Sequence, residues 1–105
     1  MNWQEKFVQI IMKQYPKSIA LMRGNFKSSQ IWKLQYMSNP RLLYDFFDEQ
    51  GIYINIVRWE EAEVWAYRII IGIKEYISFE ITHPTRTEAE EQAFIKAFEI
   101  LEDKL

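Results

Sequence analysis

Acidic side chains form the densest groups of residues in this sequence that could do chemistry. The three groups are Asp45, Asp48 and Glu49; Glu60, Glu61 and Glu63; and Glu88, Glu90 and Glu91. Neighbouring carboxylates can bind a divalent cation or act as a general acid and base. None of the groups has the spacing of a calcium-binding loop. We therefore interpret them as an exposed helix side, a polar turn and the acidic start of a helix.

His83 is the single histidine, so most nucleophilic triads and metal sites would have to use it. It lies in Thr82-His83-Pro84, a sequence typical of a turn at the end of a strand. The chain has no cysteine, which excludes disulfides, thiol nucleophiles and Cys-bound metals. No P-loop, nucleophile elbow or HExxH motif occurs. We expect no catalytic residue, no metal site and no cofactor, and hence no enzyme.

Charge is divided unevenly along the chain. Residues 1–40 hold six basic residues and one acid, a net charge of +5, whereas residues 41–105 hold seven basic and 14 acidic residues, a net charge of −7. Basic and aromatic residues are interleaved in the first segment, which suits single-stranded nucleic acid. The candidate contacts are Lys13, Lys17, Arg23, Lys27 and Lys33. We favour the alternative that this segment docks on the acidic remainder, or on that of a second subunit.

The N-terminal elements are only partly defined by the sequence. Asn2 and Glu5 suit a helix start, and Tyr15-Pro16 ends that helix because a residue before proline avoids the α conformation. Residues 17–37 are ambiguous. Ser18–Met22 fit a helix or a strand, and the alternation of apolar residues over 31–37 favours a strand there.

Two further helices have clear boundaries. Asn39 and Pro40 suit the start of a helix over 40–50, and Gly51 suits its left-handed end. After Pro84, either Thr85 with Glu88 or Thr87 with Glu90 forms a capping box for a terminal helix. Its apolar stripe is expected at Ala89, Ala93, Phe94, Ala97, Ile100, Leu101 and Leu105.

Period-two alternation between these helices predicts three strands. With Trp59 opposite Val64 and Gly72 opposite Tyr76, the isoleucines share one face of the sheet. Asn55, Arg68 and Glu80 then form a row on the other face. This outer face is a possible interaction surface made of Tyr53, Val57, Arg68, Ile70 and Tyr76. We favour its coverage by residues 17–37 over an open surface.

The expected architecture is a single α+β domain over residues 1–105. An N-terminal helix and the ambiguous segment precede an α-β-β-β-α unit, in which helices pack on one face of a three-stranded antiparallel sheet. No uncharged run approaches the length of a membrane span, and the N-terminus lacks the features of a signal peptide. We expect a soluble cytoplasmic protein without a membrane partner.

Two resemblances bear on function. The order α-β-β-β-α is similar to that of a double-stranded RNA-binding domain, but the start of the last helix is acidic here, so RNA binding does not follow. Residues 40–105 resemble short uncharacterised proteins of gut Bacteroidetes and their phages or mobile elements, which implies no activity. The resemblance is carried by Leu42–Phe47 leading into Gly51–Ile54 and by Thr85–Glu90 leading into Ala93–Phe98. We expect a small non-catalytic protein-interaction or accessory module, with a protein partner or homo-oligomer. The alternative is a nucleic-acid-associated accessory factor that uses the basic segment.

Overall fold

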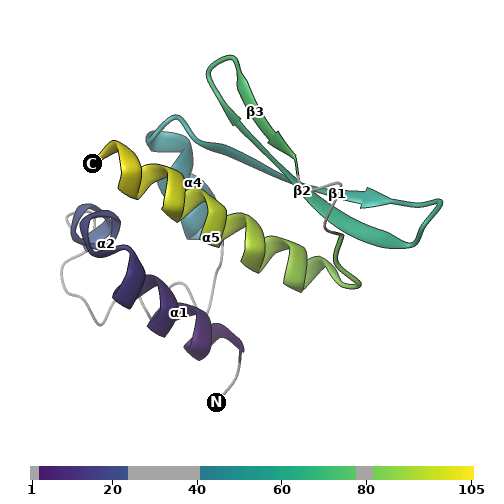
Figure 1. Cartoon of the computed structure of the whole chain (residues 1–105), viewed down its shortest axis with the longest axis horizontal. Coiled ribbons are helices and arrows are strands. Elements are labelled where there is room, and N and C mark those ends of the chain that lie inside the picture. Colours follow the sequence, from purple (N-terminus) through teal and green to yellow (C-terminus); the bar gives the residue numbers. More distant parts are fainter. Residues whose placement is uncertain (1–2, 24–40, 78–81) are drawn as a thin grey trace.

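The chain folds as a mixed α+β protein, as the sequence predicts. The structure, a computed structural model, describes residues 3–23, 41–77 and 82–105. In Figure 1 the helices lie on one side of the sheet, and the long helix α5 runs between α1 and the strands. The described elements are α1 (Trp3–Gln14), α2 (Pro16–Arg23), α4 (Arg41–Glu49), β1 (Tyr53–Trp59), β2 (Val64–Ile71), β3 (Lys74–Ile77) and α5 (Arg86–Lys104).

The first two helices meet at Tyr15-Pro16, where the sequence predicts a helix end. Pro16 occupies the first position of α2, which suits its fixed φ and its missing N–H. Ser18–Met22 are therefore helical, which settles the ambiguity between helix and strand for these residues. Asn2 and the predicted strand over 31–37 lie outside the described residues.

Helix α4 ends as the sequence predicts. Gly51 has a φ of 75°, in the left-handed region. Its N–H donates to the Asp48 carbonyl at 3.0 Å, and the Ile52 N–H donates to the Phe47 carbonyl at 2.9 Å. These two bonds form a Schellman motif, which satisfies carbonyls at the end of the helix and turns the chain into β1.

The antiparallel pairing of β1 with β2 also matches the prediction. Trp59 lies opposite Val64, and Asn55 lies opposite Arg68. The polar turn over 60–63 connects the strands, with Glu63 at a φ of 54°. Ile54 and Ile69 are consequently buried on the same face of the sheet.

The pairing of β2 with β3 differs from the prediction. Lys74, rather than Ile77, lies opposite Ile71, because Gly72 and Ile73 form a two-residue turn with Gly72 at a φ of 59°. This shift of three residues exchanges the faces of β3, since side chains alternate along a strand. The predicted third strand is thus not matched: β3 spans Lys74–Ile77, and residues 78–81 lie outside the described residues.

The predicted register does describe the far end of β2. The backbone N–H groups and carbonyls of Trp65 and His83 exchange two hydrogen bonds of 2.8 Å. His83 is six positions after Ile77 in the chain, whereas their partners Trp65 and Arg68 are three positions apart.

Helix α5 is the centre of the hydrophobic core. The Thr85 hydroxyl caps its start by accepting a hydrogen bond from the Glu88 N–H at 3.2 Å, as predicted for the first of the two capping boxes. Phe94 and Phe98 meet Phe7 of α1 on one side and Phe47 of α4 on another, with ring centroids between 4.8 and 6.4 Å apart. Because α5 is covered on two sides, Phe98 is buried in addition to the predicted stripe, whereas Leu105 of that stripe is 49% exposed and Ile100 is partly buried.

Candidate interaction surface

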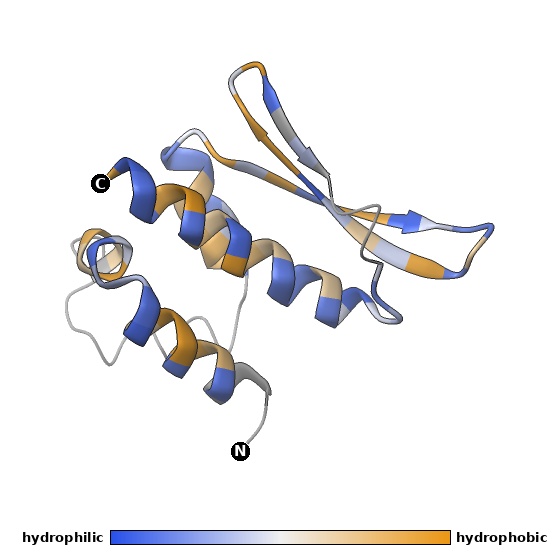
Figure 2. Cartoon of the chain, viewed as in Figure 1, coloured by the Kyte–Doolittle hydropathy of each residue, from blue (hydrophilic) through white to orange (hydrophobic). Residues whose placement is uncertain are grey.

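The sequence predicts an interaction surface on the outer face of the sheet, which points away from the helices. Tyr53 is 51% exposed and Trp59 is 45% exposed, whereas Val57 and Ile70 are partly buried. Figure 2 shows hydrophobic and hydrophilic residues mixed along both long strands, β1 and β2. The cross-strand pairs on this face are Tyr53–Ile70, Asn55–Arg68, Val57–Ala66 and Trp59–Val64.

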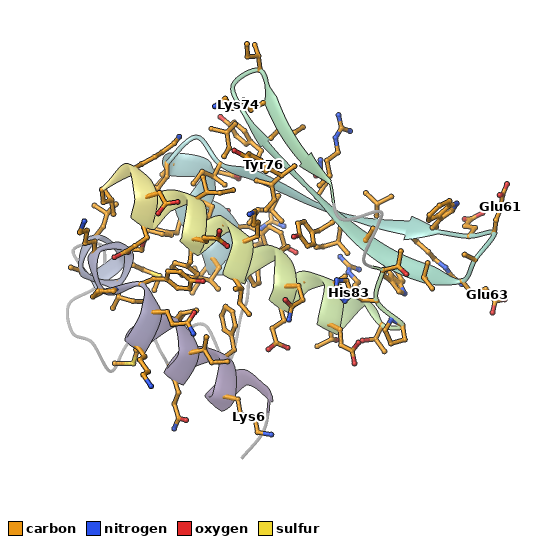
Figure 3. All side chains as sticks on the ribbon, in the orientation of Figure 1. Lys6, Glu61, Glu63, Lys74, Tyr76 and His83 are labelled. Carbon is orange, nitrogen blue, oxygen red and sulfur yellow. The ribbon has the colours of Figure 1, made fainter. Side chains whose placement is uncertain are left out.

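Two predicted features of this face are wrong. Tyr76 lies opposite the buried Ile69, on the face that meets the helices. The Lys96 ammonium lies 5.6 Å from the centre of its ring, and Figure 3 shows Tyr76 between the sheet and α5. The β3 residue opposite Arg68 is Ile77, so the register also removes the predicted pair with Glu80, which lies outside the described residues. Both errors follow from the two-residue turn at Gly72.

The outer face is not covered by the described part of residues 17–37. Residues 17–23 belong to α2, which packs with α1 and α5 on the helix side of the sheet. Residues 24–40 lie outside the described residues. The only fully buried side chain among the described pairs of the outer face is Ala66, whose methyl group is the smallest there.

The candidate nucleic-acid residues do not form a described cluster. Lys13 and Lys17 are exposed on α1 and α2. Arg23 is the last residue of α2, and its side chain is not described, while Lys27 and Lys33 lie outside the described residues. The part of the basic segment that is described, residues 3–23, packs on α5 as α1 and α2, while Lys13 and Lys17 remain exposed.

The contact between α2 and α5 is centred on Glu102. Its carboxylate accepts hydrogen bonds from the N–H of Lys17 at 3.0 Å, from the N–H of Ser18 at 2.8 Å and from the Ser18 hydroxyl at 2.8 Å. Partial burial raises the pKa of Glu102. The three hydrogen bonds and the Lys17 charge together lower it by more than burial raises it, so the pKa lies below its ordinary value. Glu102 thus caps α2 across 84 residues of sequence.

A concave feature, separate from the outer face of the sheet, lies where α4, β1 and the start of α5 meet. It is an open pocket of about 600 Å³, which was not predicted from the sequence. The Tyr44 hydroxyl donates to the Glu90 carboxylate at 2.7 Å on one wall. The lining side chains are Arg41, Tyr44, Asp45, Asp48, Ile54, Asn55, Arg86 and Glu90. The detectable signal was the spacing of Arg41, Asp45 and Asp48, which places three charges on one side of a helix.

The acidic groups separate into different environments. Asp45 and Asp48 line the pocket, but their neighbour Glu49 does not. Glu61 and Glu63 lie at the tip of the β1–β2 hairpin, far from the helices (Figure 3). In the last group, burial and the nearby Glu88 carboxylate raise the pKa of Glu91. Within residues 3–23, 41–77 and 82–105, no group of three or more histidine or acidic side chains is arranged to hold a metal ion.

His83 pairs with β2 through its backbone, close to the start of α5. Its Nε2 atom is buried and has no hydrogen-bond partner among the described residues. His83 does not line the pocket described above. The described residues therefore bring no carboxylate pair and histidine together.

Comparison with known proteins adds no functional assignment. The chain matches no protein family, no curated protein and no solved structure. Among the described helices, none combines the length and apolar character needed to cross a membrane. Any functional conclusion must therefore come from the surface of this chain.

Proposed function

We propose that this protein is a non-catalytic protein-interaction module that binds a partner through the outer face of its sheet. The observation that carries the proposal is the exposure of Tyr53 and Trp59 on a sheet face from which the described helices are absent. Tyrosine and tryptophan are enriched in protein interfaces, where they contribute large apolar contact areas. Two such side chains at the two ends of one strand define a contact surface along β1.

The size of the face favours a reversible complex. The seven residues of β1 and a sheet of three strands give a face of about 24 Å by about 14 Å. A stable interface commonly buries about 800 Å² on each partner, which is more than twice this plan area. The partner must therefore supply an apolar surface that meets Tyr53, Val57 and Ile70, and the complex should form transiently.

Site-specific photo-crosslinking tests the proposal in the cells that produce the protein. A photoreactive phenylalanine analogue replaces Tyr53 in the full chain, and the same analogue replaces Ile73 in the control. Ile73 is fully exposed in the β2–β3 turn, outside the pairs of the outer face. We expect one defined protein to be captured at position 53 and not at position 73.

Binding of the captured protein is then measured with purified components. We expect Tyr53→Lys to weaken binding by about tenfold or more, since a charge would enter an apolar contact, and Ile73→Lys to leave it unchanged. The proposal is overturned if the two positions capture the same proteins, or if Tyr53→Lys binds as tightly as the natural chain. If the crosslinked product is a dimer of this chain, the partner at the outer face is a second copy and not a different protein.

A further inference from the structure

The two edges of the sheet differ in how well they are protected against an added strand. β3 has four residues and begins with Lys74 and Glu75, and short, charged edge strands resist pairing with other chains. β1 has seven residues, contains neither glycine nor proline, and carries a single charge at Arg58. Within the part of the chain that the structure describes, β1 pairs only with β2. Alternate residues of β1 therefore direct their backbone N–H and carbonyl groups away from the sheet.

The open pocket lies along the β1 edge of the described sheet. Ile54 and Asn55 of β1 form part of its lining, so the edge of the strand borders the pocket. Helix α4 supplies the facing wall through a row of polar side chains. At about 600 Å³, the pocket falls in the size range of sites that hold small ligands.

The charges around the pocket are of both signs, and Glu90 among them is bonded to Tyr44. Asp45 and Asp48 are exposed on α4, and Arg86 is exposed in the first turn of α5. None of these three side chains forms an ion pair or hydrogen bond with another residue of the described ranges. The pocket can thus attract a cation toward α4 and an anion toward the start of α5, where the helix dipole adds to the charge of Arg86.

We propose that the β1 edge binds an extended peptide segment of a partner protein as an added strand. A basic side chain of the peptide faces Asp45 and Asp48, and an acidic side chain faces Arg86. Main-chain hydrogen bonds to β1 supply affinity in this mode, and the flanking charges supply specificity. The site shares β1 and Asn55 with the outer face, but its charged residues Asp45, Asp48 and Arg86 lie on the helices, so charge variants there test it separately from the Tyr53 surface.

Selection of peptides by the full-length protein tests this site. A phage library of random seven-residue peptides is selected on the natural chain, and clones that also bind the support without protein are removed. We expect the remaining peptides to alternate β-branched or aromatic residues with polar ones and to contain one basic and one acidic residue. A synthetic copy of the most enriched peptide then serves as the probe.

Three charge variants locate the bound peptide. We expect Asp48→Lys and Arg86→Glu each to weaken peptide binding by about tenfold, because an attraction becomes a repulsion at an interface. Glu49→Lys is the matched control, since Glu49 is an exposed acid on the same helix but does not line the pocket. Unfolding midpoints equal to that of the natural chain show that each variant is folded.

N-methylation of the probe distinguishes strand addition from binding by side chains alone. In an added strand, every second N–H bonds to β1, so methylation should abolish binding at alternate positions and be tolerated between them. The proposal is overturned if no peptide is enriched, if Glu49→Lys weakens binding as much as Asp48→Lys, or if the effect of methylation does not alternate. Formation of a dimer that both Asp48→Lys and Arg86→Glu disrupt would instead assign the edge to the β1 strand of a second copy.

Discussion

Ser18 donates two hydrogen bonds of 2.8 Å to the Glu102 carboxylate, one from its backbone N–H and one from its hydroxyl. Ser18 is fully buried, and it occupies the third position of α2, where a helix needs an external acceptor for its N–H. A residue near the C-terminus therefore completes a helix near the N-terminus. The basic first part of the chain is joined to the acidic second part by this bond pair and by the aromatic core.

Replacement of Glu102 by glutamine should destabilise the fold. The carboxylate provides the helix cap of α2, and loss of a cap commonly costs about 0.5–2 kcal/mol. We expect the free energy of unfolding of Glu102→Gln to fall by about 1–2 kcal/mol in urea titrations at pH 7. Asp103→Asn is the control, because this neighbour is exposed, and it should change stability by less than about 0.5 kcal/mol. Equal effects of the two substitutions would contradict the capping role.

The stabilising effect of Glu102 should depend on pH in a defined direction. Its pKa in the fold is lowered from the ordinary value of 4.5, so the folded protein favours the ionised form. The contribution is fully present above pH 4.5 and is lost as the pH falls through the lower pKa of the folded state. The stability difference between the natural chain and Glu102→Gln should therefore shrink on acidification. Unfolding curves between pH 7 and pH 2.5 check this, and a difference that grows at low pH would refute it.

Glu91 should show the opposite sign. Burial and the Glu88 charge raise its pKa above the ordinary value of 4.5, so ionised Glu91 opposes folding at neutral pH. We expect Glu91→Gln to be more stable than the natural chain at pH 7, and this gain to vanish below pH 4.5, where the carboxyl is protonated in both states. Thermal unfolding at pH 7 and pH 4 provides the comparison. A variant that is less stable at pH 7 would show that the charge at position 91 is favourable.

The aromatic contacts of α5 make a further prediction. Phe98 is fully buried against Phe7, Tyr15 and Phe47. Phe98→Ala should lower the free energy of unfolding by about 3–5 kcal/mol, the usual cost of removing a buried ring. Ile100→Ala, at a partly buried position, should cost about 1 kcal/mol. If Phe98→Ala does not fold, Phe98→Leu is compared with Ile100→Ala instead. A lower free energy of unfolding for Ile100→Ala than for the Phe98 variant would contradict this packing.

Patterns that depend on neighbours in sequence could be predicted. The Schellman end of α4 at Gly51, the Thr85 cap and the pairing of Trp59 with Val64 all follow from local residue types and alternation. The helical state of Ser18–Met22 could not be predicted, because its cap comes from Glu102, 84 residues away from Ser18. Phe98 was not included in the predicted apolar stripe of the last helix. A single stripe describes one contact face, whereas α5 contacts α1 on one side and α4 on another.

The placement of Tyr76 shows a different limit of sequence patterns. Isoleucine alternation on β2 and β3 tolerates more than one register, so the turn decides which one forms. The two-residue turn at Gly72 places Tyr76 opposite Ile69 and under Lys96, with the core. Part of the candidate surface could therefore be predicted from β1 and β2, where Tyr53, Val57, Arg68 and Ile70 have the expected register. The pocket was not predicted, since its walls come from α4, β1 and α5.

Methyl NMR of the natural chain during titration with the captured protein tests the central proposal most directly, because adjacent residues of one strand report on opposite faces. Val57 and Ile70 lie on the outer face, and Ile54 and Ile69 lie in the core. The account predicts that the methyl signals of Val57 and Ile70 shift on binding, while those of Ile54 and Ile69 keep their positions. Equal shifts on both faces, or shifts confined to residues of α1 and α2, would contradict binding at the outer face of the sheet.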